Sequence, residues 1–305
     1  MSIQLMIMAA LFIAASNFCL RRSIDSGGTS KAYLMIQLSL TFVIAILLNP
    51  VRTGDYTWST PMAYFAMIEG LMLGSLMLFL GKALELGPPG LTFAALNSAT
   101  VMPSLVMVAV FGASFGYTYT LFNAIGSVLV IIGLFWAGWG AHIAQNKMRW
   151  IIFTFGSFTA HMLFLILVAW RALIINFPGA NPPFIPFASI DANNQWFMPV
   201  VFCVAALMQI VIYFSTQSQL PSRCETLYGA IGSMAYAAGF FFLIWSSEVA
   251  TSFEHALLFP IFSVTIIIIC NLWGKYLYQE KINWAANGCC VLGILIGTVD
   301  WKVLL

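Results

Sequence analysis

The chemistry of this chain must come from a few polar residues, and Glu69 is the clearest of them. It lies near the middle of the apolar segment 61–86. An ionisable group at that depth of a bilayer is costly, so it is a functional candidate. We expect a cavity carboxylate that meets an ammonium group or takes up a proton. The alternative is a carboxylate that a neighbouring helix neutralises for packing.

A polar helix face surrounds a proline further along the chain. Asn97, Thr100 and Ser104 follow i, i+3, i+7 spacing and therefore share one face. Pro103 removes a backbone hydrogen bond and is expected to kink or open the helix. Carbonyls freed beside a cavity can bind a ligand. Ser98, next to Asn97, completes this candidate group.

A second polar pair precedes another proline by the same intervals. Glu254 and His255 stand before Pro260 as Asn97 and Ser98 stand before Pro103. Each half of the chain would then offer a polar pair one to two turns before a proline. The alternative for Glu254 and His255 is a helix start at the membrane surface.

An aromatic and small-residue stripe follows in the segment 226–246 and its approach. Glu225, Tyr228, Gly232, Tyr236 and Gly239 recur at helical spacing. Tyr228 and Tyr236 can stack on a flat or apolar part of a ligand. Plain helix packing explains the same stripe equally well.

Four further residues are candidates with open alternatives. His161 lies mid-segment, where a neutral imidazole binds a ligand or serves the structure. Arg171 can bind a carboxylate or phosphate through two hydrogen bonds, but we favour its extending to the lipid headgroups. Asn17 and Gln209 are weaker candidates, because amides also join helices in membranes.

The composition defines the class of protein that must position these residues. Of 305 residues, 61% are hydrophobic and 7% are charged, and the net charge is +2. Soluble domains carry about 25% charged residues, so most of this surface faces lipid. No basic run suggests nucleic acid as a partner. The cysteines show no metal-ligand spacing and are expected to be free thiols: Cys19, Cys203, Cys224, Cys270, Cys289 and Cys290.

Apolar segments of about 20 residues predict membrane-spanning helices. We predict ten of them: 3–20, 32–48, 61–86, 88–111, 119–139, 150–175, 196–217, 226–246, 253–276 and 283–303. Asn49 and Pro50 are expected to stop the second. A polar joint, 141–149, separates the halves 1–140 and 150–305.

The two halves have a similar plan at their ends. In each half a polar break is followed by an apolar run with spaced glycines, Gly126 and Gly133 in the first and Gly288, Gly293 and Gly297 in the second. Small residues let helices approach closely in lipid. Two copies of a five-span unit insert in opposite orientations, so we predict an all-α membrane protein built from two inverted five-helix repeats.

Three stretches resemble a known family. They are Ala14-Ala-Ser-Asn-Phe18, then Pro103 with the break before Gly126, and Glu280-Lys-Ile-Asn-Trp-Ala-Ala-Asn-Gly288. Together they are similar to the ten-span, EamA-type members of the drug/metabolite transporter superfamily, over nearly the whole chain. The resemblance implies a secondary transporter with a central cavity lined by helices one to four and six to nine, supported by helices five and ten.

The resemblance also implies the kind of substrate. Members carry amino acids and their derivatives, nucleotide-linked sugars and other small metabolites. Both signs of charge together with tyrosines favour a zwitterion, such as an amino acid or an S-adenosylmethionine-like compound. A nucleotide sugar or another exported metabolite or drug is the alternative. Coupling to a proton or to an exchanged solute is expected, and no cofactor.

Missing motifs narrow the other classes. The chain has no Gly-x-x-x-x-Gly-Lys-Ser/Thr loop for nucleotide hydrolysis. It has no Gly-x-Ser-x-Gly nucleophile motif and no His-Glu-x-x-His zinc motif. An intramembrane enzyme is therefore the less favoured rival, and a membrane scaffold is the third class.

Basic residues predict the orientation, because short cytoplasmic loops are rich in Lys and Arg. One side of the ten-span arrangement carries Arg21, Arg22, Lys31, Lys82, Lys147, Arg149, Arg223, Lys275 and Lys281. The other carries Arg52, Arg171 and Lys302. In the cytoplasmic (inner) membrane, both termini would then be outside the cytoplasm. The proline-containing loop 177–195 is expected to cover the external mouth.

Overall fold

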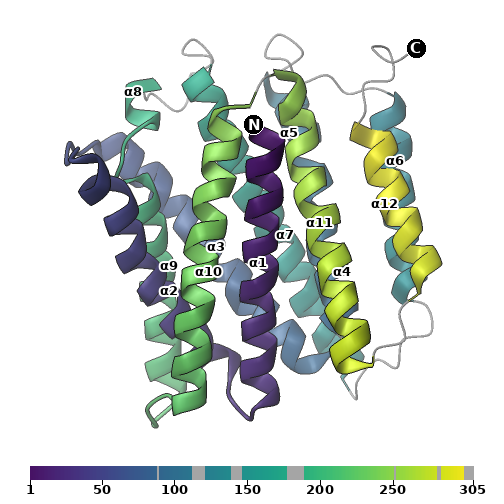
Figure 1. The fold of residues 1–305 in the computed structure, drawn as a ribbon, viewed down its shortest axis with the longest axis horizontal. Helices are drawn as coiled ribbons and strands as arrows, with labels where there is room; N and C mark the ends of the chain where they lie inside the picture. The colour runs from purple at the N-terminus through teal and green to yellow at the C-terminus, as the bar shows by residue number, and fades with distance from the viewer. Residues whose placement is uncertain are drawn as a thin grey trace.

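The structure is a computed structural model in which the secondary structure of the described residues is entirely helical (Figure 1). It describes residues 1–87, 89–111, 121–138, 146–176, 189–250, 252–279 and 283–298. The helices are α1 (Ser2–Asp25), α2 (Ser30–Ile46), the π-helical η1 (Leu47–Val51), α3 (Thr60–Leu86), α4 (Pro89–Ser98), the 3₁₀ turn η2 (Ala99–Val101), α5 (Met102–Phe111), α6 (Leu121–Gly138), α7 (Lys147–Asn176), α8 (Ser189–Ala192), α9 (Phe197–Thr216), α10 (Arg223–Glu248), α11 (Ser252–Tyr278) and α12 (Trp284–Thr298).

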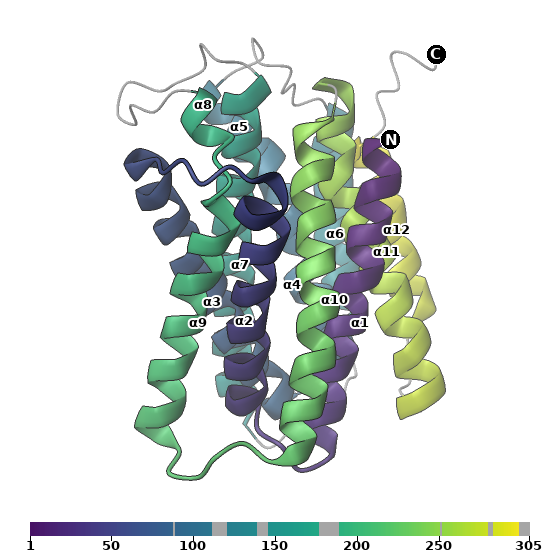
Figure 2. The same ribbon diagram turned by 60° about the vertical axis from the view of Figure 1, so that its left-hand side comes forward.

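The long helices run side by side, as Figures 1 and 2 show from two directions. Within the described residues, seven helices are long and apolar enough to cross a membrane. Their outward faces carry large apolar side chains, which suit contact with lipid. The chain is thus an all-helical protein with the helices of a multi-pass membrane protein.

Local sequence signals set where these helices begin. The Thr29 side chain accepts a hydrogen bond from the backbone of Ala32 at the start of α2, and Ser59 does the same for Met62 at the start of α3. At α10, Ser222 and Glu225 form a capping box. Glu225 Oε1 also accepts a hydrogen bond from the Thr29 backbone N–H at 2.7 Å. One carboxylate therefore joins the first turns of α2 and α10.

The second helix does not stop at Asn49 and Pro50, and that expectation was wrong. It continues as a wider π-helical turn through Val51. Pro50 has no N–H to donate, and the Asn49 side chain instead donates to the Ala45 carbonyl at 3.0 Å. The wider turn accommodates the proline, so the chain does not leave the helix there.

The α-helix that contains Pro103 is interrupted just before the proline, by a tighter 3₁₀ turn and not by an opening of the helix. The span changes from α4 to a 3₁₀ turn at Ala99–Val101 and resumes as α5 at Met102, one residue before the proline. The second half behaves differently, because α11 is one continuous helix with Pro260 inside it. The two prolines at similar positions thus have different effects on their helices.

Helices of the first half of the chain pack mainly against helices of the second half. α1 packs against α10 and α11, while α3 packs against α7 and α9. α2 contacts α9 and α10, and α7 also contacts α4 and α5. The buried core runs through these helices and is rich in large aromatic and aliphatic side chains.

α6 and α12 form a separate pair at one edge of the bundle, on the right in Figure 1. Glycines make their close approach possible: a Cβ added at Gly126 would lie 2.4 Å from the Gly293 carbonyl oxygen. One added at Gly133 would lie 2.6 Å from Cys290 Sγ. The predicted close packing of the glycine-spaced segments is confirmed. None of the six cysteines, all of which lie in the described part of the chain, forms a disulfide bond.

Candidate functional site

Four of the predicted site residues meet in one pocket at the centre of the bundle. Asn17, Asn97, His161 and Tyr236 line a cavity of about 40 Å³. They come from α1, α4, α7 and α10, and the rest of the lining is apolar, from these helices and from α3 and α11. Residues far apart in sequence are thus brought together at mid-helix depth. We call this cavity the central pocket.

The polar groups of the central pocket are only partly used by the protein. Asn97 Nδ2 donates to the Phe93 carbonyl at 2.7 Å. His161 Nδ1 lies 3.0 Å from the Leu96 carbonyl oxygen, so a neutral ring donates from Nδ1 and keeps Nε2 as an acceptor. Within the described residues, His161 Nε2, Asn97 Oδ1, the Asn17 amide and the Tyr236 hydroxyl have no protein partner. The pocket therefore offers uncharged donors and acceptors to a ligand.

The central pocket is small in this conformation. Its volume of about 40 Å³ suits one or a few water molecules. Small-molecule sites enclose roughly 300–1,000 Å³. A metabolite can enter only if the surrounding helices move.

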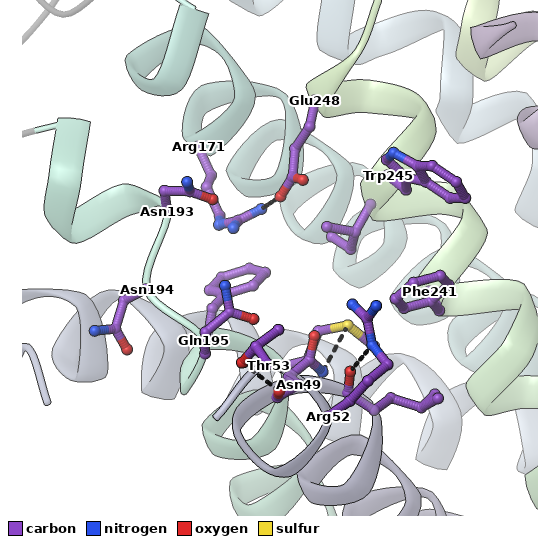
Figure 3. Close-up of a pocket in the computed structure, with 14 residues that line it drawn as sticks. Asn49, Arg52, Thr53, Arg171, Asn193, Asn194, Gln195, Phe241, Trp245 and Glu248 are labelled. Carbon is purple, nitrogen blue, oxygen red and sulfur yellow. Dashed lines mark hydrogen bonds and ion pairs between the residues drawn. The ribbon is translucent and has the colours of Figure 1, made fainter. Parts of the chain in front are cut away.

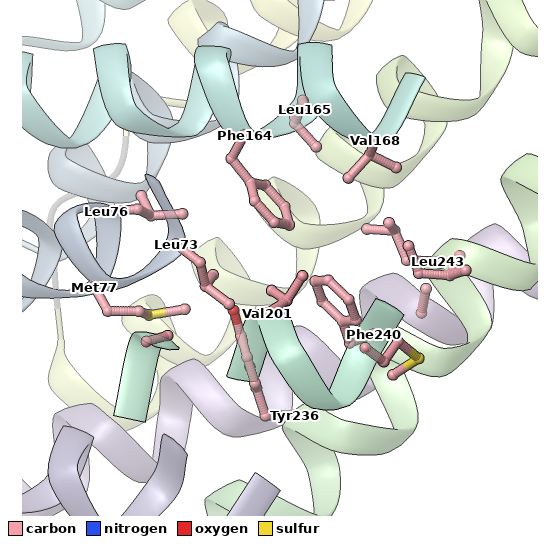
Figure 4. Packing of buried hydrophobic residues seen from close by; sticks show 14 of the residues in the cluster. Leu73, Leu76, Met77, Phe164, Leu165, Val168, Val201, Tyr236, Phe240 and Leu243 are labelled. Carbon is pink, nitrogen blue, oxygen red and sulfur yellow. The ribbon is translucent and has the colours of Figure 1, made fainter. Parts of the chain in front are cut away.

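An apolar layer on α7 and α10 forms one end of the central pocket, and three of its residues also line the pocket: Phe164, Phe240 and Leu243. Figure 4 shows Phe164, Val168, Phe240 and Leu243 gathered in this layer, and all four are buried. Phe202 of α9 packs against Phe240 with ring centroids 4.7 Å apart. The layer separates the central pocket from the end of the bundle where α7 and α10 finish.

A second, larger cavity lies at that end, which we call the vestibule (Figure 3). It measures about 570 Å³ and is formed by the end of α2 and η1, the ends of α7 and α10, and the approach to α9. Arg171 lies roughly 15 Å further along α7 than His161, at 1.5 Å per residue. The two cavities thus lie one after the other along α7 and α10.

Arg171 lines the vestibule and does not extend to the headgroups, so that preferred expectation was wrong. Its Nη1 pairs with Glu248 Oε1 at 2.6 Å. Its guanidinium lies 4.1 Å from the centre of the Phe197 ring. The side chain is buried, because the protein itself supplies a carboxylate and an aromatic face. Arg171 belongs to a fixed ion pair on the vestibule wall.

The vestibule contains functional candidates that the sequence did not single out. Glu248 and Arg52 both line it, and both stand at helix ends. At such positions a charged residue reads as an ordinary surface group. Glu248 pairs with Arg171, which lies 77 positions away in sequence. Only the fold shows that these two residues lie together.

Glu69 is fully buried and lines neither cavity. Within the described residues, neither of its carboxylate oxygens has a hydrogen-bond partner. Its α3 backbone neighbour Gly70 packs against Val201 of α9. Arg171 is the charged residue that interacts with it electrostatically. Burying a carboxylate without partners is expensive, so Glu69 remains the strongest candidate for a group that changes its charge or partner during function.

The polar side chains of three other predicted site residues form hydrogen bonds within or between helices in this conformation. Gln209 Nε2 donates to the Gly74 carbonyl at 2.8 Å and so joins α9 to α3. Thr100 Oγ1 lies 2.6 Å from Ser263 Oγ, which connects the 3₁₀ turn to α11. Ser98 Oγ donates to the Ala95 carbonyl in its own helix. None of the three lines the central pocket or the vestibule.

The predicted stripe on α10 divides between packing and the pocket. Tyr228 is half-buried against the core. A Cβ at Gly232 would meet the Tyr33 hydroxyl, and one at Gly239 would meet Ile13. The glycines therefore admit α2 and α1 closely, while Tyr236 alone of this stripe lines the central pocket.

The remaining predicted site residues lie partly outside the part of the chain that the structure describes. Glu254 is half-buried near the start of α11 and contributes to neither cavity. The side chains of His255 and Ser104 lie outside the description, as do Glu280 and Lys281.

The described end of the long loop contributes to the vestibule. Asn193, Asn194 and Gln195 line it, while 177–188 lie outside the described residues. Asn194 Nδ2 donates to the Thr57 carbonyl at 2.9 Å. Ser59 Oγ donates to Asp191 Oδ1 at 2.6 Å. This part of the loop is therefore fastened to the segment before α3, beside the mouth of the vestibule.

Compared with known proteins, the chain matches no family model and no curated protein. It is similar in fold to solved structures. One of them, described only as the crystal structure of a protein, matches 97% of this chain and 99% of its own, with a TM-score of 0.55 and 13% sequence identity. At that identity the likeness concerns the fold alone.

Proposed function

We propose that the chain is a secondary transporter that moves a small zwitterionic metabolite across the membrane by alternating access. The observation that carries this proposal is the central pocket, where unpartnered polar groups from four helices lie at mid-bundle depth. Polar groups inside a membrane bundle mark solute pathways. A small central pocket beside a larger vestibule suits a protein that admits its solute from one side at a time.

The helix contacts support the inverted repeat that we propose within this fold. Exchanging the halves would map α1 onto α7, α2 onto α9, α3 onto α10, α4 and α5 onto α11, and α6 onto α12. The exchange turns the α1–α10 contact into α7–α3 and the α2–α10 contact into α9–α3, and these pairs do pack. It also turns α1–α11 into α7 with α4 and α5, and leaves α2–α9 and α6–α12 unchanged. Transporters use such repeats around a central site.

The proposed substrate is an amino acid or an amino-acid derivative such as S-adenosylmethionine. The vestibule presents both signs of charge through Arg52, Arg171 and Glu248, together with aromatic side chains. A multiply phosphorylated solute would need more cations than this.

The proposed membrane is the cytoplasmic one, with ten spans and both termini outside the cytoplasm. The spans beyond the seven long helices would be α4 with α5, α6 and α12. The vestibule lies where α2, α7 and α10 end, on the side with fewer basic residues. It would therefore open to the outside.

Uptake into proteoliposomes tests the proposal. Purified protein should accelerate accumulation of at least one labelled amino acid or S-adenosylmethionine without ATP, driven by a proton gradient or by a counter-solute inside. Empty liposomes are the control. Absence of any solute flux, together with turnover of an added lipid or peptide, would favour the intramembrane-enzyme alternative and contradict the proposal.

A further inference from the structure

We propose that the vestibule is a second binding site, which holds an amino acid by its two charges before the solute reaches the central pocket. Arg52 binds the carboxylate, Glu248 binds the ammonium group, and Phe241 and Trp245 contact the apolar side chain. The nature of the ligand rests on the proposed function. The existence of a separate site rests on the cavity itself.

The size of the vestibule suits a whole ligand, unlike that of the central pocket. Its volume of about 570 Å³ lies within the range of roughly 300–1,000 Å³ typical of small-molecule sites. The central pocket measures about 40 Å³. In this conformation the vestibule alone of the two can hold an amino acid.

Arg52 provides a cation that is oriented but not neutralised. Its Nε donates to the Leu48 carbonyl at 2.7 Å, which fixes the guanidinium. Its Cζ lies 5.6 Å from the centre of the Phe241 ring. Within the described residues, its Nη groups have no acceptor. Two N–H donors side by side match the geometry of a carboxylate.

Glu248 provides the matching anion on the opposite side of the cavity (Figure 3). Oε1 is held by Arg171, and among the described residues no partner is found for Oε2. The side chain remains 25% exposed, so Oε2 can accept from an ammonium group. Arg171 is buried against Phe197 and acts as a positioning residue for Glu248.

The charge balance selects a ligand with both signs. Two arginines and one glutamate line the vestibule, so a ligand with only an ammonium group meets a net positive wall. A ligand with only a carboxylate leaves Glu248 Oε2 unmatched. A phospholipid headgroup with a phosphate and an ammonium group shares this chemistry, and the test must separate it from a free amino acid.

The test is equilibrium binding of labelled L-phenylalanine to the purified, phospholipid-depleted protein in detergent, with the other protein amino acids as competitors. We expect saturable binding. Phenethylamine and 3-phenylpropionate, each lacking one charge, should compete at least tenfold more weakly than phenylalanine. Glycerophosphoethanolamine should compete poorly.

Arg52→Gln should weaken binding about tenfold, because it removes a charge-assisted contact. Arg149→Gln is the matched control, since it removes an exposed arginine at the opposite end of α7. Glu248→Gln keeps an acceptor for Arg171 and should also weaken binding. Asn97→Ala, in the central pocket, should leave this binding intact while slowing uptake.

Three results would overturn the inference: no binding by wild type, equal binding by Arg52→Gln, or stronger competition by glycerophosphoethanolamine than by any amino acid. The last would assign the vestibule to a lipid headgroup. Amino-acid uptake with unaltered binding in Arg52→Gln would contradict this site and leave the proposed function standing. Vestibule binding without uptake of any solute would contradict the proposed function alone.

Discussion

The central pocket and the vestibule lie along the same two helices and differ in how they treat charge. The pocket offers an imidazole, a phenol and two amides, and is too small for a metabolite. The vestibule offers Arg52, Arg171 and Glu248 and is more than large enough for an amino acid. Desolvating an unpaired charge is far more expensive than desolvating a neutral polar group. Charges are therefore kept where water enters, and neutral groups face the site that must close.

Glu69 is the exception to this division. It is a buried acid between the α3 and α9 walls, outside both cavities. Arg171, which holds Glu248 in the vestibule, also interacts electrostatically with it. A change of charge at Glu69 would alter the balance of charges around Arg171 and so affect the vestibule wall.

The largest predicted effect is an all-or-none difference in accessibility, which would establish the side that the vestibule faces. In a background without native cysteines, Thr57→Cys, in the exposed segment between η1 and α3, should react with an impermeant maleimide outside intact cells, and the exposed Asn146→Cys should not. The reason is the excess of Lys and Arg on the side of Asn146. Labelling of Asn146→Cys alone would place the vestibule on the cytoplasmic side.

Glu69→Gln should remove most uptake while the protein remains folded and inserted. The substitution keeps the size of the side chain but fixes its charge at zero, so the link to Arg171 is lost. Uptake rates in proteoliposomes, at equal protein content, provide the measurement. Glu85→Gln is the matched control on the same helix: Glu85 stands at its end, pairs with Lys82 and accepts hydrogen bonds from Ser30 at the start of α2. Glutamine keeps an acceptor for Ser30, so this variant should change uptake less than twofold. Wild-type rates in Glu69→Gln would contradict the role of Glu69.

Asn97→Ala should lower the maximal rate of uptake about tenfold, because it removes one hydrogen-bonding group that faces the central pocket. The neighbouring substitution Ser98→Ala is its control. The Ser98 hydroxyl bonds within its own helix, to Ala95, and its removal should have less than a twofold effect. If the two variants lose the same share of the maximal uptake rate, the effect does not depend on whether the side chain faces the central pocket, and the role of Asn97 is contradicted.

The smallest predicted effect separates the packing stripe of α10 from its pocket residue. Gly232→Ala should destabilise the protein by about 1–3 kcal/mol, because the added methyl meets the Tyr33 hydroxyl. That hydroxyl donates to the Ser16 carbonyl at 2.9 Å, so α1 and α2 are both disturbed. Gly288→Ala, with no atom within 4 Å of the added Cβ, should be neutral. Thermal unfolding in detergent measures both, and equal midpoints would contradict the packing role.

Much of the pocket could be predicted from sequence, because polar residues in the middle of apolar segments stand out. This rule selects Asn17 and His161, while the polar face beside Pro103 gives Asn97 and the aromatic stripe gives Tyr236; the fold brings all four together. The same rule also selected Gln209, whose amide joins two helices instead. Sequence position cannot distinguish an amide that faces a cavity from one that faces a carbonyl.

The vestibule could not be predicted, because its residues are ordinary at their positions in the chain. Arg52 follows a π-helical turn that no composition rule anticipates, and Glu248 ends a helix. The ion pair with Arg171 depends on how α7 and α10 pack. The sequence did indicate the close glycine contacts of α6 with α12, since spaced glycines in apolar segments have few other uses.

The most direct test of alternating access is the reactivity of a cysteine in the central pocket from each side of the membrane. In the background without native cysteines, Asn97→Cys should react with an impermeant maleimide added from either side. Saturating solute should shift the ratio of the two rates, because the solute changes the populations of the two conformations. Arg52→Cys, in the vestibule, should react from one side only and serves as the control. Reaction of Asn97→Cys from a single side, unaffected by any transported solute, would contradict the account.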